Sequence, residues 1–261
     1  MPAAYADGIS EMTGADRPSA RVISANLVLP PYRGRRRNVA HKTDMLTYIG
    51  QFFNHDIDLA MDAHEAEWAN ITIPEGDFHF DPFGTGSETM PFQRSGYNTS
   101  RPASATREQV NTITSYLDGS VVYGESLEKA DKLRAHYKGK MSTFNGMLPT
   151  NFMGVTMANP AGVEKDTDLR AAGDVRANVN AALLAIQTLF IREHNRLAEE
   201  IEAKNPTWTD EQIFREARKW NVAIMQAICF YEYLPMLGFQ VPPYAGYDSS
   251  INVGKETKEL R

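Results

Sequence analysis

The chain has 261 residues, of which 42% are hydrophobic and 23% charged, as is usual for a globular protein with a substantial core. Its net charge of −6 argues against a nucleic-acid partner, because phosphate binding requires a positive surface. No apolar run approaches the ~20 residues that a membrane helix needs, and the first residues do not have the form of a signal peptide. The sequence therefore indicates a soluble protein, secreted only if a leader has been removed.

The first part of the chain divides into a polar arm and an apolar helix. Residues 1–43 are interrupted by Pro and Arg, including the arginine-rich stretch 33–37, and predict an extended arm wrapping the rest of the protein. Residues 44–60 predict a helix, because apolar side chains recur at helical spacing: Met45, Leu46, Ile49, Phe52 and Phe53.

The remaining elements indicate a mainly α fold with long loops and little β structure. Residues 77–106 lack any period and predict a loop that shapes a functional surface, residues 127–136 predict a short helix, and residues 141–160 predict a loop. A long helix is predicted over 175–204, with Gly173 and Asp174 as its cap. The next begins at a capping box, Thr209 to Gln212, and runs to about Tyr233. Two long antiparallel helices joined by a short turn are typical of helical domains.

The stretch from Gly50 to Asp56 carries the clearest chemistry. Gln51 and His55 are four residues apart, so both lie on one face of the predicted helix. A neutral imidazole beside a carboxamide can take a proton from a small molecule and return it elsewhere. A lone helical His is more often a surface or hydrogen-bonded core residue, so the spacing alone does not establish catalysis.

This stretch resembles the distal-histidine motif of the animal-type haem peroxidases, the superfamily that also contains the cyclooxygenases. The resemblance covers about residues 4–245 and predicts the mainly α fold of that family. Six further stretches follow in the family's order: Tyr5–Gly8, Arg17–Arg21, Thr114–Glu125, Gly173–Arg176, Arg192–Ala198 and Tyr233–Pro235. The resemblance also favours a loop and helix start over the short strand that the Val and Tyr content of residues 116–123 suggests.

The resemblance implies a haem b cofactor and assigns three catalytic residues. His55 would move a proton between the two oxygens of hydrogen peroxide, and Gln51 would hold water, peroxide or a halide. Arg176 would stabilise negative charge on the departing oxygen. Because a cation in the first turn of a helix opposes the macrodipole, this placement suggests function. A salt bridge between Arg176 and Asp174 is the competing explanation.

The family pattern also implies a Ca²⁺ site that fixes the helix carrying His55. Alternate residues of an extended segment project to one side, and hard oxygen ligands without sulfur or imidazole suit Ca²⁺. The expected ligands are Asp56, Thr114, Tyr116, Asp118 and Ser120. Without the resemblance, a plain turn would be the better interpretation.

The chain departs from the family in two respects. Mammalian members attach haem through an Asp and a Glu, and here those positions are Asn54 and Val179. We therefore expect haem held without covalent bonds, in contact with Gln51, Asn54, His55, Arg176 and Val179. The family's proximal His, the axial ligand of the iron, is also absent, and His194 is interpreted as a structural residue.

The sequence thus predicts that residues 44–261 form the distal-side portion of a haem peroxidase domain, oxidising a small donor or halide with hydrogen peroxide. A second chain, or a missing C-terminal half, would supply the proximal His. One alternative is a fatty-acid oxygenase of the same superfamily, which a membrane-binding segment or an acyl channel would favour. Another is a non-catalytic, calcium-stabilised interaction module or a truncated fragment.

Overall fold

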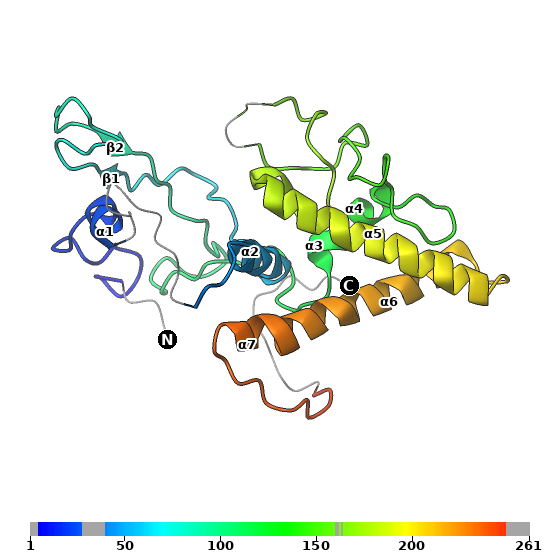
Figure 1. The fold of residues 1–261 in the computed structure, drawn as a ribbon. Helices are drawn as coiled ribbons and strands as arrows, with labels where there is room; N and C mark the ends of the chain where they lie inside the picture. The colour runs from blue at the N-terminus through cyan, green and yellow to red at the C-terminus, as the bar shows by residue number, and fades with distance from the viewer. Residues whose placement is uncertain (1–4, 28–39, 160–161, 163, 249–261) are drawn as a thin grey trace. The chain divides into compact units, whose positions relative to one another are not determined.

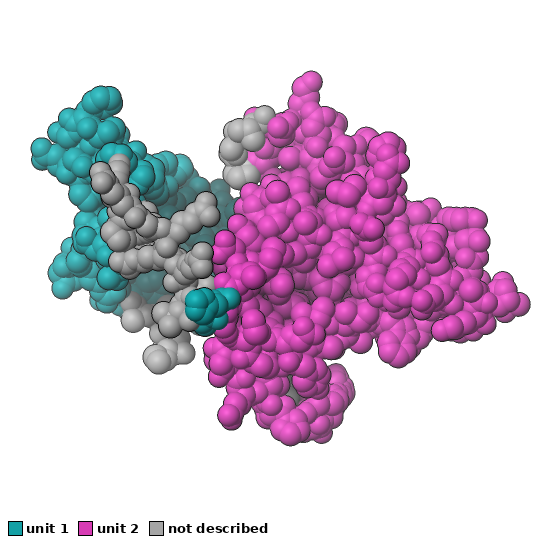
Figure 2. Space-filling model, viewed as in Figure 1, with its two compact units in different colours: residues 1–41, 60–110 teal, residues 42–59, 111–261 magenta. Residues whose placement is uncertain are grey.

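A computed structural model of the protein describes residues 5–27, 40–159, 162 and 164–248 (Figure 1). The predicted mainly α fold is confirmed. The chain divides into two compact units, one of residues 1–41 and 60–110 and the other of residues 42–59 and 111–261 (Figure 2). Within the described ranges, the helices are too short or too polar to cross a membrane. The arginine-rich stretch 33–37 lies outside the described residues.

The first unit contains one helix and one short hairpin. Strands β1 (Ile71–Thr72) and β2 (Thr89–Met90) pair antiparallel, with Ile71 opposite Met90. Helix α1 (Ala20–Leu27) lies inside the segment for which we predicted an extended arm, so this part of the arm is helical. It is held by Arg21, whose buried guanidinium makes two hydrogen bonds to the carboxylate of Asp77. This charge-assisted pair is the kind that a buried cation needs.

The second unit is built on a helical hairpin. Helices α5 (Ala181–Lys204) and α6 (Asp210–Ile228) run side by side (Figure 1). The predicted capping box is present: the Thr209 hydroxyl accepts the backbone N–H of Gln212, and the Gln212 side chain accepts that of Thr209. The hairpin buries an apolar stripe that includes Leu183, Ile191 and Met225, each fully shielded from solvent.

Three predicted helix boundaries are wrong, one of them being the end of the helix predicted over 44–60, which lies at Ile57. The long helix begins at Ala181 instead of residue 175, because Asn180 is in an extended conformation and its side chain accepts the N–H of Leu183. Residues 177–179 form a separate 3₁₀ turn, η1 (Ala177–Val179). Helix α4 (Leu127–Lys132) ends four residues early, and His136 adopts a positive φ of 52° that no helix residue has.

Helix α2 (Met45–Ile57) packs against this hairpin. The ring of Phe52 stacks on that of Phe190 in α5, with centroids 4.8 Å apart and planes 6° from parallel. Phe52 is fully buried and Phe53 nearly so. Burial of each such side chain contributes about 1.5–3 kcal/mol, so α2 is fixed by its aromatic face.

The end of α6 changes to a π-helix, η2 (Cys229–Tyr233), which continues into the short helix α7 (Leu234–Met236). The Tyr233 ring packs edge-on against Phe53, with centroids 5.5 Å apart. A Cβ atom on Gly50 would lie 2.2 Å from the Tyr233 hydroxyl oxygen. Gly50 is therefore the residue that allows this tyrosine to approach α2.

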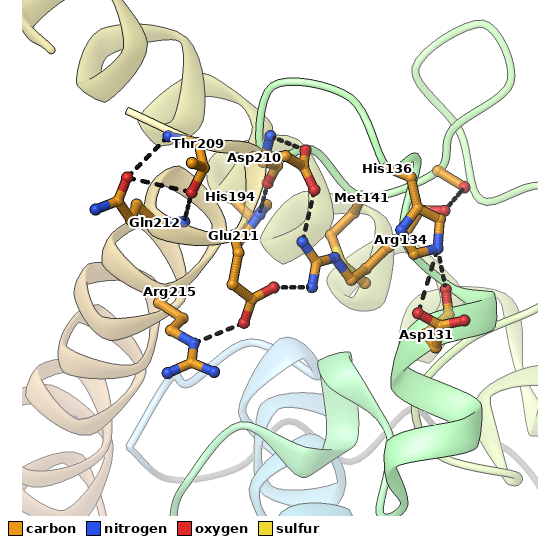
Figure 3. A network of polar contacts seen from close by, with 12 residues as sticks. Asp131, Arg134, His136, Met141, His194, Thr209, Asp210, Glu211, Gln212 and Arg215 are labelled. Carbon is orange, nitrogen blue, oxygen red and sulfur yellow. Dashed lines mark hydrogen bonds and ion pairs between the residues drawn. The ribbon is translucent and has the colours of Figure 1, made fainter. Parts of the chain in front are cut away.

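A polar network attaches the loop at residues 134–141 to the helical hairpin (Figure 3). Arg134 pairs with Asp210 at 2.7 Å and with Glu211, at the start of α6. The fully buried His194 of α5 bonds to the carbonyl oxygen of Gly139 at 2.8 Å and to the hydroxyl of Tyr123 at 2.9 Å. His194 therefore joins three segments of the core, in agreement with its interpretation as a structural residue.

Candidate active site

His55 lies among the buried residues of α2. Phe52 and Phe53 precede it, Asp56 follows it, and only 6% of the His55 surface is exposed. Its Nδ1 is buried, makes no hydrogen bond with the described residues and lies 3.4 Å from Oδ1 of Asp174. Burial lowers the pKa of His55, the positive charge of Arg176 lowers it further, and the charge of Asp174 partly opposes both. The imidazole is therefore neutral near pH 7, as a proton acceptor must be.

Arg176 is fixed beside α2 by two sets of hydrogen bonds. Its Nε donates to Oδ1 of Asp174 at 2.9 Å, and its Nη2 donates to Oδ2 at 2.8 Å. Nη2 also donates to the backbone carbonyl of His55 at 3.2 Å. The salt bridge that we considered as a competing explanation is thus present, and it places the guanidinium next to His55.

The position of Arg176 differs from the sequence-based expectation. The residue precedes the 3₁₀ turn η1 and lies outside α5, because α5 begins at Ala181. The argument from an unfavourable macrodipole in the first turn of a long helix is therefore wrong for this residue.

Gln51 lies one turn before His55 on α2, as its spacing predicts. Its Oε1 accepts a hydrogen bond of 2.9 Å from Nδ2 of Asn180, the residue whose other side-chain atom caps α5. The bonds from Arg176 and Asn180 hold residues 176–180 alongside α2. Val179, which lies between Arg176 and Asn180 in the sequence, is 60% exposed. Asn54 on α2 is also exposed.

The side chain of Asp56 accepts hydrogen bonds at the N-terminus of helix α3 (Ser120–Tyr123). The carboxylate is fully buried and accepts hydrogen bonds from the backbone N–H of Gly119 and Val121 and from the Ser120 hydroxyl, at 2.8–3.1 Å. The pKa of Asp56 is raised to about 6: burial is the largest cause, the charge of Asp118 adds to it, and the hydrogen bonds from Val121, Gly119 and Ser120 oppose it. A cation at this position would offset both the burial of the Asp56 charge and its repulsion by Asp118.

The other predicted Ca²⁺ ligands form local turns. Thr114 Oγ1 accepts the N–H of Tyr116 at 3.0 Å, and Oδ1 of Asp118 accepts the N–H of Ser120 at 3.0 Å. The structure brings Asp56, Asp118 and Ser120 together, and no hydrogen bond joins Thr114 or Tyr116 to these three. Within the described part of the chain, no three His, Cys, Asp or Glu side chains meet as a metal cluster. Two carboxylates with hydroxyl and carbonyl oxygens remain a donor set that fits Ca²⁺.

Sequence reasoning missed the connecting roles of two residues. Asp174 contacts both His55 and Arg176, and Asn180 orients Gln51. For Asp174 the available signal was its position two residues before the predicted catalytic arginine. For Asn180 it was the preference of Asn for helix N-caps.

The chain is similar to a known protein family and to several of its members. The family model described as animal haem peroxidase matches residues 1–257. Peroxidase A from Dictyostelium discoideum, a solved structure, aligns with a TM-score of 0.83 at 32% identity, over 96% of this chain and 50% of that one. The Drosophila melanogaster dual oxidase is 35% identical over 97% of this chain and 17% of its own length. Peroxinectin A of D. discoideum is 35% identical over 81% of this chain and 42% of its own length.

The helical fold is that of a haem peroxidase domain. The chain belongs to the animal haem peroxidase family. It spans half of the solved relative and less than half of the two other relatives.

Proposed function

We propose that this chain forms the distal side of a haem peroxidase, which reduces hydrogen peroxide while oxidising a small donor or a halide. The observation that carries the proposal is the neutral, buried imidazole of His55 beside the fixed guanidinium of Arg176. A proton acceptor next to a permanent cation is the pair that heterolytic cleavage of an O–O bond requires.

The residues around this pair fit a haem. The apolar side chain of Val179, three residues after Arg176, is exposed and offers surface for a flat apolar group. Gln51, Asn54, His55, Arg176 and Val179 would contact the cofactor, without a covalent bond because neither Asn54 nor Val179 carries a carboxylate. When bound, haem b supplies the iron that accepts the oxidising equivalents of peroxide.

Each side chain has a separate task in the proposed reaction. His55 takes the proton from one peroxide oxygen and gives it to the other, so that water departs instead of hydroxide. The charge of Arg176 stabilises the negative charge that develops on the departing oxygen. Gln51, whose carboxamide is oriented by Asn180, holds the small molecule by hydrogen bond and does not titrate.

We also propose that Ca²⁺ binds at Asp56, Asp118 and Ser120, with oxygens of Thr114 and Tyr116 completing the site. Asp56 directly follows His55 and is fully buried, so a cation there would fix the helix turn that carries the base. Binding would remove the destabilising effect of burying a carboxylate beside a second one.

The proximal half of the site would come from another polypeptide segment, either a second chain or a C-terminal continuation. The chain spans half of the solved peroxidase that it matches, so the other half of that structure has no counterpart in these residues. On this proposal residues 44–261 are the distal portion of the domain.

The test is the reaction of the haem-loaded protein with hydrogen peroxide, using hemin and added imidazole as a substitute axial ligand. His55→Ala should slow the reaction with hydrogen peroxide by roughly 10²–10⁴-fold, the contribution usual for a positioned acid–base group. The exposed His64→Ala is the matched control and should react like the unmodified protein. A loss below tenfold for His55→Ala would remove this residue from the mechanism.

A further inference from the structure

Asp174 is a buried carboxylate that lies between two functional side chains. Its own side chain is 3% exposed, and its backbone N–H donates to the carbonyl oxygen of Val121 in α3 at 3.0 Å. Among the described residues, Arg176 alone donates to this carboxylate, from its backbone N–H at 2.8 Å, from Nε at 2.9 Å and from Nη2 at 2.8 Å. Oδ1 is also 3.4 Å from Nδ1 of His55.

These contacts fix the direction of the guanidinium. The donors of an arginine side chain lie in one plane, and here two of them, Nε and Nη2, each donate to a different oxygen of Asp174. This bidentate arrangement holds the guanidinium in one orientation. The same Nη2 reaches the backbone carbonyl of His55. Loss of the carboxylate would leave Arg176 with only this single bond to α2, and its charge would no longer be balanced.

The carboxylate also favours one tautomer of His55. A negative charge near Nδ1 stabilises a proton on that nitrogen, and Nε2 of a neutral imidazole is then the unprotonated atom. Hydrogen-bonded carboxylates set the tautomer of catalytic histidines in the same way in the Ser-His-Asp triad. Among the described residues Nδ1 makes no hydrogen bond, and the Asp174 carboxylate lies 3.4 Å from it, so we expect the charge of Asp174 to set the tautomer.

We propose that Asp174 is the positioning residue of this site, which holds the Arg176 guanidinium beside α2 and keeps the His55 proton on Nδ1, so that Nε2 is the base. This inference rests on the proposed peroxidase function for its catalytic meaning. The competing explanation is that Asp174 only stabilises the turn before η1, in which case the tautomer of His55 would not depend on it.

The first experiment reads the tautomer directly and requires no haem. The ¹⁵N chemical shifts of the His55 ring are measured at pH 8 in the full chain labelled with ¹⁵N-histidine, and His55→Gln assigns the signals. We expect the Nδ1–H form in the unmodified protein. A predominant Nε2–H form there would overturn the proposal, whatever the variants show.

The second experiment compares variants that separate charge from structure. Asp174→Asn keeps the shape but removes the charge, so the population of the Nε2–H form should rise. Asp174→Glu restores the carboxylate and should restore Nδ1–H, and Arg176→Lys, which keeps the carboxylate, should leave the tautomer unchanged. The exposed Asp168→Asn carries the same charge change and should have no effect. An unchanged tautomer in folded Asp174→Asn refutes the proposal.

Reaction with peroxide then tests the catalytic meaning. In the haem-loaded protein, Asp174→Asn should lower the second-order rate constant roughly 10- to 100-fold, the size found when outer-shell partners of metal-binding histidines are lost. A shifted tautomer with an unchanged rate would refute the catalytic role of Asp174. If neither the unmodified protein nor any variant reacts with peroxide, the peroxidase proposal fails while the tautomer measurement still decides the role of Asp174.

Discussion

Acidification should destabilise this protein through His194. The imidazole is fully buried, its Nε2 donates to the carbonyl of Gly139, and its Nδ1 accepts the hydroxyl proton of Tyr123. Neither nitrogen has room for another proton without breaking a bond. The pKa of His194 is lowered from 6.5 to about 4: burial is the largest cause, the bond to Gly139 opposes it, and the charges of Arg134 and Arg218 add to it.

The size of the effect follows from linkage. A depressed pKa in the folded state means that the unfolded chain binds more protons between pH 6.5 and pH 4, so stability is complete above 6.5 and falls as the pH drops. The full difference corresponds to about 3 kcal/mol, of which about 2 kcal/mol is lost by pH 5. Asp56 acts in the opposite direction, because its pKa is raised, and its carboxyl gains protons on folding near pH 5.

Urea denaturation of the unmodified protein and of His194→Gln, at pH 8 and at pH 5, isolates this contribution. The variant should be less stable at pH 8, and the gap should narrow by about 2 kcal/mol at pH 5, since Asp56 contributes equally to both proteins. The exposed His64→Gln is the control and should keep a constant difference from the unmodified protein. A gap for His194→Gln that does not change with pH would refute the reasoning.

Three further predictions concern the site. Gly50→Ala should lower the melting temperature although Ala favours helices by about 1 kcal/mol, because its Cβ would meet the Tyr233 hydroxyl, and adding Tyr233→Phe should recover part of the loss. Chelation of Ca²⁺ should lower the melting temperature of the unmodified protein but not that of Asp118→Asn; equal responses would remove the proposed metal site. Acid extraction of the haem-loaded protein should release unmodified haem, and haem retained by the denatured chain would show that Asn54 and Val179 do not prevent attachment.

Local signals in the sequence were sufficient for the helices that end in strong caps. The capping box at Thr209 and Gln212 located the start of α6, and the apolar spacing before His55 located α2. The position of Gln51 and His55 on one helical face followed from their spacing alone. These features depend on residues close together in the chain, so periodicity and capping rules describe them.

The start of α5 shows why one such signal failed. Gly173 and Asp174 have the composition of a cap, but the carboxylate of Asp174 is used by Arg176, and Asn180 caps the helix instead. Both residues are good N-caps by type. Only the tertiary structure decided between them, because the choice depends on where Arg176 is held.

The sequence by itself determined that this is a mainly helical member of the animal haem peroxidase family, with His55 on a buried helix. The tertiary structure decided how the site is joined: Arg176 bonds to the carbonyl of His55, 121 positions away, and Asn180 bonds to Gln51, 129 positions away. The physical reason is that these contacts arise from the packing of α2 on α5 through Phe52 and Phe190. A contact between two packed helices cannot be predicted from the pattern of residues within either helix.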